Sequence, residues 1–269
     1  SAKILFFQLI KINQHALCGI MKKIKHPHGN VRSFFLKFVK NLIQKTLRFF
    51  VNCVCKLDSY DEIIISSATH APWKKDKKFF KFYKNVENFT LLDPARSYTL
   101  WQCANNIKNI KGQILDIGCL MGGAGFIMSK KNIKGKTYLF DSFSGFKKDD
   151  GLHKQDVFFY EDINLVKKNI NKLKLKNTFV LKAYFPKNIK IKLKDIKLCH
   201  LDVNTFKDTS AIFHVINKKM IKGGIIVFDD FGIWGVDGIK KFIYQIEKRY
   251  KDRYYFFKNY MGQCILIRK

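Results

Sequence analysis

The sequence predicts an α/β fold in which a mostly parallel, doubly wound sheet ends in an antiparallel edge strand, with a basic helical extension before it. Three observations support this prediction. Short apolar strands alternate with helical segments from residue 113 to 269, a pattern typical of a parallel sheet covered by helices. The first of these strands runs directly into a glycine-rich turn. At 269 residues and 47% hydrophobic content, the chain can bury one such domain and an appendage.

Charge and cysteine content narrow the setting of the protein. The formal charge of +30 is typical of a nucleic-acid or anionic-membrane partner, but the basic residues are spread along the chain rather than clustered. We therefore interpret much of the charge as compositional and favour nucleic acid less as a partner. The seven cysteines form no CxxC pair and no His–Cys metal spacing, which indicates a reduced, intracellular setting. No apolar run reaches the roughly 18 residues that span a bilayer, so we expect a cytoplasmic protein.

Residues 1–57 are predicted to form a basic amphipathic helical extension. No Asp or Glu precedes Asp58, and over residues 32–51 the apolar and basic side chains separate onto two sides of a helix. Such a helix can lie at an anionic membrane surface, which would place the protein at the inner membrane face. Its apolar side can equally pack on the main domain or a second subunit. The apolar side holds Phe35, Val39, Leu42, Ile43, Leu47 and Phe50, and the basic side holds Lys37, Lys40, Lys45 and Arg48.

Residues 58–112 are predicted to form a helical linker or cap on the substrate side. Residues 61–68 fit either a short strand or the start of a helix. Residues 72–90 mix lysine with phenylalanine, tyrosine and tryptophan. Such aromatic side chains can stack on nucleic-acid bases, or they can form the buried face of a surface helix, which we favour. Helical spacing then runs from Ser97 to Ile107, and Gly112 follows before the first strand.

Residues 113–269 hold the predicted catalytic domain. We expect strands at 114–117, 136–141, 178–183, 196–202 and 225–230, and a final pair at 254–258 and 264–267. Helices are expected over 126–131, 163–173, 209–220 and 238–249, the third of them closed by Gly223 and Gly224. The polar residues 147–160, which include Asp149, Asp150 and Gly151, would lie at the mouth of a site as a lid.

The glycine turn marks a binding site for a nucleotide-type ligand. It reads Ile114-Leu-Asp-Ile-Gly-Cys-Leu-Met-Gly-Gly-Ala-Gly125. Gly118 permits a sharp turn and close approach of a ligand, and Gly122 and Gly123 leave helix N-terminal amides uncovered. Asp141 ends the second strand 23 residues beyond Gly118, where an acid holds a ribose diol in such folds.

Three acids end two further strands of the predicted sheet. Asp202 ends the fourth strand, and Asp229 and Asp230 end the fifth. The carboxyl ends of parallel strands meet in one crevice, so we expect these side chains to converge there. Three carboxylates in one place repel unless they share a proton or a cation. Oxygen ligands with open positions suit Mg²⁺ better than zinc, and such an ion would lower the pKa of a substrate hydroxyl.

Over about residues 88–250 the chain resembles the macrocin O-methyltransferase (TylF/MycF) family of Rossmann-like methyltransferases, which use S-adenosylmethionine and Mg²⁺. Four stretches carry the resemblance in order and spacing: Ile114–Gly125, Tyr138-Leu-Phe-Asp-Ser-Phe-Ser-Gly145, His200-Leu-Asp-Val-Asn-Thr-Phe-Lys-Asp-Thr209 and Lys222-Gly-Gly-Ile-Ile-Val-Phe-Asp-Asp-Phe-Gly232. It implies that S-adenosylmethionine is bound by Gly118, Gly122, Gly123 and Asp141, and the metal by Asp202, Asp229 and Asp230. Within the same stretches we assign Asp116, Ser142 and Phe143 to the cofactor site. Family members methylate sugar hydroxyls and many are oligomeric, so a homo-oligomer is implied.

The chain departs from the family pattern at three places. The acid expected two residues after the first metal-binding Asp, the family's general base, is Asn204, which cannot accept a proton in that role. We keep Asp202 and Asn204 as the catalytic positions. The Trp-Arg before the paired glycines is Leu120-Met121, and the Tyr-Glu-Ser after the acidic motif is Phe206-Lys207-Asp208. Three alternatives follow: the metal alone activates the hydroxyl, another group such as Asp208 or a lid acid accepts the proton, or the activity is weak.

The favoured function is O-methylation of a sugar hydroxyl of a glycoside, nucleotide sugar or surface glycan, with S-adenosylmethionine and Mg²⁺. RNA ribose methylation is an alternative suggested by the charge and by residues 72–90. A non-catalytic S-adenosylmethionine-binding or membrane-associated partner protein is a second alternative, suggested by Asn204 and the basic N-terminal segment.

Overall fold

The computed structural model describes residues 35, 38–39, 41–47, 49–50, 70–145, 162–233 and 236–269. The chain divides into two compact units, Ser1–Ser67 and Ala68–Lys269. The described residues between Phe35 and Phe50 are helical, as expected. The expected strand or helix at 61–68 and the expected lid at 147–160 lie outside the described residues. The three-part division at residues 57 and 112 stays a prediction.

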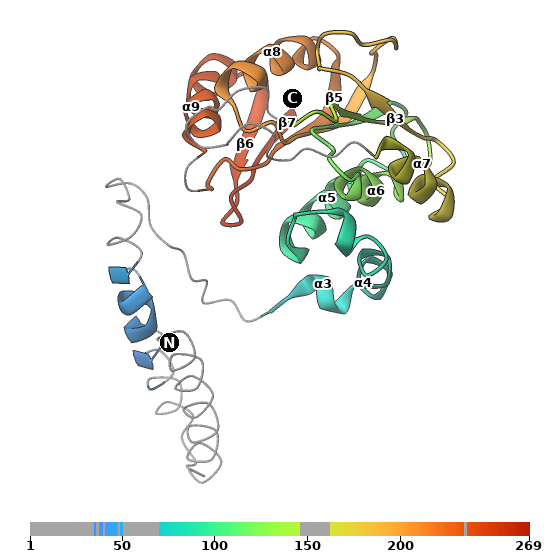
Figure 1. The fold of residues 1–269 in the computed structure, drawn as a ribbon. Helices are drawn as coiled ribbons and strands as arrows, with labels where there is room; N and C mark the ends of the chain where they lie inside the picture. The colour runs from blue at the N-terminus through green and yellow to red at the C-terminus, as the bar shows by residue number, and fades with distance from the viewer. Residues whose placement is uncertain are drawn as a thin grey trace. The chain divides into compact units, whose positions relative to one another are not determined.

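A seven-stranded sheet forms the centre of the second unit (Figure 1). Its order is β3 (Thr178–Lys182), β2 (Thr137–Asp141), β1 (Gln113–Ile117), β4 (Ile196–Leu201), β5 (Met220–Phe228), β7 (Cys264–Arg268) and β6 (Tyr254–Lys258). The first five strands are parallel, and β7 pairs antiparallel with β5 and β6. The predicted doubly wound sheet with an antiparallel edge is confirmed. The strand order reverses between β1 and β4, where such folds bind ligands.

Helices cover both faces of the sheet because its strands are apolar on both sides. Along β1, Ile114 packs into one hydrophobic cluster and Leu115 into the other, as the two-residue period of a strand requires. One cluster includes residues of α5 (Pro94–Asn106), α6 (Gly123–Ser129) and α7 (Ile163–Lys172). The other includes residues of α8 (Phe206–Asn217) and α9 (Asp237–Tyr250). Figure 1 shows α8 and α9 on one side of the sheet and α5 to α7 on the other.

The aromatic residues before α5 belong to the core. They lie in α3 (Pro72–Lys75), α4 (Lys77–Tyr83) and the short 3₁₀ helix η1 (Glu87–Phe89). Phe79, Phe82 and Tyr83 are buried, and the first two rings pack against Trp101 of α5. The favoured interpretation of residues 72–90 as a helical surface with a buried aromatic face is therefore confirmed for these rings, which cannot stack on bases from the core.

Three expected helix ends were wrong, each by three residues. The helix expected at 209–220 begins at Phe206, because the Thr205 hydroxyl accepts a hydrogen bond from the amide of Asp208 and caps the helix. It ends at Asn217, and Met220 already begins β5, so Gly223 and Gly224 lie inside a strand instead of closing a helix. Similarly, the helix expected from Ser97 begins three residues earlier, where Asp93 caps Pro94–Asn106.

Among the described residues, no helix is long and apolar enough to cross a membrane. Cys103, Cys119, Cys199 and Cys264 are free and buried.

Candidate active site

The turn after β1 brings the ends of β1 and β4 into contact. Gly118 has φ +86°, which favours glycine, and a Cβ there would lie 1.9 Å from the carbonyl oxygen of Asp202. The amide of Asp202 in turn donates to the carbonyl oxygen of Ile117 over 2.9 Å. No larger residue fits at this turn unless the two strand ends separate.

Asp141 joins this turn to the end of β2. One carboxylate oxygen accepts a hydrogen bond from the amide of Leu120 and the other from the amide of Phe143, both over 2.8 Å. Burial raises the pKa of Asp141, and these hydrogen bonds partly offset the increase. Each oxygen keeps a second lone pair that can accept a hydrogen bond from a ligand hydroxyl.

A cavity of about 340 Å³ opens above these strand ends. Most of the predicted site residues line it, namely Gly118, Asp141, Ser142, Asp202, Asn204, Asp229 and Asp230. The strand-end acids and the glycine turn therefore line one cavity, as the sequence predicted. Apolar side chains complete the lining, among them Leu120, Phe140 and Phe185.

Four predicted cofactor residues are not among those that line this cavity. Asp116 is fully buried, and Phe143 is 1% exposed. A Cβ on Gly122 would meet the ring of Phe126 at 2.7 Å, and one on Gly123 would meet the carbonyl oxygen of Phe89 at 2.4 Å. The missing side chains of these glycines therefore make room for packing within the fold. A cofactor role for the four residues stays a prediction.

The three strand-end acids lie together around Asn204. In the amide orientation that satisfies its neighbours, Asn204 donates to Asp230 Oδ2 over 2.8 Å and to Asp202 Oδ1 over 3.3 Å. Ligand atoms of His200, Asp202 and Asp229 all lie within 4.8 Å of one another. Asn204 therefore connects two carboxylates through its amide hydrogens at the position where the family pattern has an acid.

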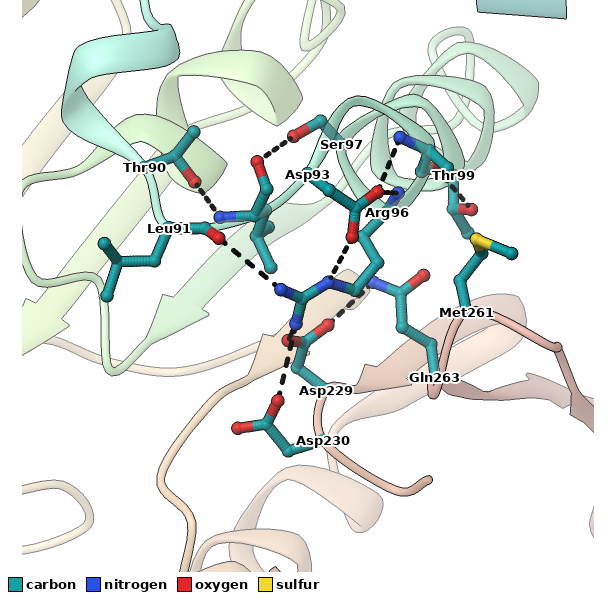
Figure 2. Close-up of polar contacts among 12 residues, drawn as sticks. Thr90, Leu91, Asp93, Arg96, Ser97, Thr99, Asp229, Asp230, Met261 and Gln263 are labelled. Carbon is teal, nitrogen blue, oxygen red and sulfur yellow. Dashed lines mark hydrogen bonds and ion pairs between the residues drawn. The ribbon is translucent and has the colours of Figure 1, made fainter. Parts of the chain in front are cut away.

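An arginine that the sequence did not single out contacts the same acids (Figure 2). The Arg96 guanidinium donates from one nitrogen to Asp229 Oδ2 over 2.5 Å and to Asp230 Oδ1 over 3.4 Å. Its Nε donates to Asp93 Oδ2 over 2.9 Å, and Asp93 Oδ1 caps the start of α5. Gln263 of the β6–β7 hairpin donates to Asp229 Oδ1 over 2.8 Å.

A buried histidine, His200, lies between Asp116 and Asp229. His200 Nδ1 lies 2.8 Å from Asp116 Oδ1, and its Nε2 lies 3.9 Å from Asp229 Oδ1, beyond hydrogen-bond distance. Burial lowers the pKa of His200, but attraction to Asp116 and Asp229 outweighs it and raises the pKa to about 10. The neighbouring carboxylates therefore favour the protonated form of His200, and the contact with Asp116 positions its ring.

The environments of the three acids set their pKa values apart. Burial and repulsion from Asp229 and Asp230 raise the pKa of Asp202 well above its ordinary value. Burial also acts to raise the pKa of Asp229, but His200, Arg96 and Gln263 lower it overall. Burial and the charge of Asp229 raise the pKa of Asp230 to about 6. This pattern indicates excess negative charge that Arg96 and His200 only partly compensate.

Residues 63–251 match the family described as Macrocin-O-methyltransferase (TylF). The chain belongs to the macrocin O-methyltransferase family. As a member, it is an S-adenosylmethionine-dependent O-methyltransferase, and the predicted resemblance is confirmed. No curated protein sequence matches the chain significantly.

Solved structures share the fold of this O-methyltransferase. The O-methyltransferase NovP has a TM-score of 0.59 at 17% identity, covering 67% of this chain and 82% of its own. The SAH-bound methyltransferase PaMTH1 of Podospora anserina has a TM-score of 0.55 at 12% identity, covering 79% and 100%. The calicheamicin methyltransferase CalS11 has a TM-score of 0.53 at 12% identity, covering 78% and 99%.

Proposed function

We propose that this O-methyltransferase methylates a sugar hydroxyl of a glycoside, nucleotide sugar or surface glycan with the help of Mg²⁺. The observation that carries the proposal is the single cavity shared by Gly118 and the three acids. It would bring a methyl donor seated at the glycine turn within reach of a hydroxyl held at Asp202, Asp229 and Asp230.

The cavity suits S-adenosylmethionine in the groups that line it. Gly118 lines the cavity at the turn, so a donor bound there can lie against its backbone. Asp141 has lone pairs to accept hydrogen bonds from ribose hydroxyls, and Leu120 and Phe140 provide apolar surface. The donor sulfonium is already activated, so the protein's task is to align it with the acceptor.

The acidic residues suit Mg²⁺ by donor type and charge. Asp202, Asp229 and Asp230 offer hard carboxylate oxygens, which this ion prefers. The raised pKa of Asp202 is a sign of negative charge that a divalent cation would relieve. When bound there, Mg²⁺ would lower the pKa of an acceptor hydroxyl.

Asp208 is the residue that we assign to accept the acceptor's proton. Of the carboxylates that line the cavity in the described part of the chain, Asp141 is bonded to two amides and three form the acidic site. Asp208 remains, and its Oδ2 accepts a hydrogen bond from the Thr205 hydroxyl, which fixes its orientation. Asn204 cannot take the proton, since a neutral amide is not a base at this pH. We expect Asp208→Asn to lower kcat about 10²- to 10⁴-fold while SAH affinity is unchanged, as measured by calorimetry.

The test of the proposed function is methyl transfer from radiolabelled S-adenosylmethionine to a panel of glycosides, with an Mg²⁺ titration. We expect activity to require the metal and Asp229→Asn to lose most of it. Asp237→Asn is the control, because Asp237 is an exposed acid at the start of α9 and outside the cavity. Full activity in chelator would exclude the metal role. S-adenosylmethionine binding without transfer to any hydroxyl would instead support the non-catalytic alternative.

A further inference from the structure

Arg96 links the acidic site to α5, a helix far from it in sequence. The side chain is 15% exposed and comes from 133 residues before Asp229. With Gln263 on Asp229 Oδ1 and Arg96 on Asp229 Oδ2, both oxygens of this carboxylate already have donors (Figure 2). A metal ion that used Asp229 Oδ2 would meet the positive charge of the guanidinium at contact distance.

Arg96 also has hydrogen-bond partners outside the acidic site. Its Nε is bonded to Asp93, whose side chain is 48% exposed, and another guanidinium nitrogen lies 3.4 Å from the carbonyl oxygen of Leu91. Arg96 lines the cavity, and its side chain is 15% exposed, so there is free space beside it. It can therefore leave the acids while its bond to Asp93 remains.

We propose that Arg96 is an internal counter-cation that competes with the divalent metal for Asp229 and Asp230. When the metal binds these carboxylates, it replaces the guanidinium of Arg96, which withdraws. The inference rests on the proposed metal site, and it makes Arg96 the residue that sets the metal affinity of that site. The opposite role, in which Arg96 orients Asp229 as a ligand, would make metal binding depend on Arg96.

The test is Mn²⁺ affinity of the full chain, measured by calorimetry without substrate. Removal of a competing cation by Arg96→Gln should tighten binding roughly 5- to 150-fold, the usual range of coupling between two sites. Arg249→Gln removes the same charge from an exposed position on α9 and should change the affinity less than about twofold. Arg96→Lys, which keeps the charge but loses the fork, should fall between wild type and Arg96→Gln.

If Arg96→Gln binds Mn²⁺ no more tightly than wild type while it keeps its SAH affinity, which shows that it is folded, the proposed competition is wrong. The proposed metal site would still stand. If Arg96→Gln does not fold, Arg96→Lys that binds Mn²⁺ no tighter than wild type would overturn the competition. Absence of Mn²⁺ binding in every variant would overturn both the competition and the proposed metal site.

A separate observation concerns the helix in the first unit. Seven of its eight described apolar side chains are exposed, from 39% for Leu47 to 66% for Phe49, and Val39 is half-buried. The exposed ones are Phe35, Phe38, Leu42, Ile43, Leu47, Phe49 and Phe50. Apolar surface on this scale marks a site of interaction with a partner or a membrane.

Charge selects the occupant of this apolar face. Residues 1–67 hold eleven Lys and Arg and three acids, and the remaining +22 of the chain's +30 lies on residues 68–269. A second copy of the chain or its own catalytic unit would therefore oppose positive charge with positive charge. An anionic lipid surface accepts both the apolar face and the basic side that the sequence predicts for this helix.

We infer that this helix binds the surface of an anionic membrane. The test is co-sedimentation of the full chain with vesicles of 70:30 phosphatidylcholine and phosphatidylserine, and with phosphatidylcholine alone. We expect binding to the mixed vesicles only. Leu42→Glu should reduce it at least about tenfold, because it removes an apolar anchor and adds repulsion.

Asn41→Glu is the matched control, since it adds the same charge beside Leu42 at a position outside the apolar set. It should reduce binding by about fivefold, the effect of one charge near the surface. Equal binding to both vesicle types, equal loss in both variants, or a dimer in solution that Leu42→Glu dissociates would each overturn the inference.

Discussion

The clearest structural test concerns the turn at Gly118, where both the backbone conformation and the surrounding space require a glycine. In Gly118→Ala the new Cβ would lie 1.9 Å from the carbonyl oxygen and 2.8 Å from the carbonyl carbon of Asp202. These are backbone atoms, and the amide of Asp202 is bonded to Ile117, so no side-chain rotation relieves the clash. The ends of β1 and β4 must move apart.

The magnitude has two parts. An alanine with positive φ costs about 1–2 kcal/mol, and overpacking adds about 1–3 kcal/mol. Gly223→Ala is the control, because Gly223 also has positive φ, +73°, but nothing lies within 4 Å of its Cβ position. The difference between the two variants in free energy of unfolding should therefore be about 1–3 kcal/mol.

The assay is urea unfolding followed by tryptophan fluorescence, together with titration of SAH into each variant. We expect Gly118→Ala to be the less stable protein and to bind SAH at least about tenfold more weakly, equivalent to about 1.4 kcal/mol. Gly223→Ala should bind SAH as wild type does. If the two variants are equally stable and bind SAH equally well, the reasoning about the turn is refuted.

Two further predictions concern groups outside the cavity. Burial lowers the pKa of Lys197 from 10.5 to about 8, so this lysine holds its proton more tightly in the unfolded chain than in the folded one. The free energy of unfolding should therefore rise between pH 8 and 10.5. Lys197→Met should lack this rise in urea titrations, and a pH profile identical to that of the wild type would contradict the assignment. Asp76 accepts hydrogen bonds from the Phe79 amide and the Trp101 indole, so Asp76→Ala should lower the free energy of unfolding by about 1–2 kcal/mol, and an unchanged melting temperature would count against this role.

The sequence predicted the strand ends of the site because each acid directly follows an apolar run. Asp141, Asp202 and Asp229 all lie at such positions, and the parallel sheet then brings them to one edge. Local sequence alone was enough to place each acid at a strand end, because the parallel topology then brings these ends together.

The residues that the sequence missed reach the site from elements with no motif. Arg96 sits in the first turn of α5, and Gln263 directly precedes β7, so neither adjoins one of the site's acids in sequence. The boundary of α8 was missed for a local reason, because the pair of Thr205 and Asp208 is a capping signal that the apolar periodicity does not register. His200 did have a signal, since it lies two residues before Asp202 in the motif.

The most direct measurement of the central claim is a crystal structure of the protein with SAH and Mn²⁺. We expect SAH to lie against Gly118 with its ribose at Asp141. We also expect an anomalous manganese peak among Asp202, Asp229 and Asp230, with Arg96 turned away from them. SAH bound away from Gly118, or no manganese at the three acids with Arg96 still bonded to Asp229, would contradict the central claim.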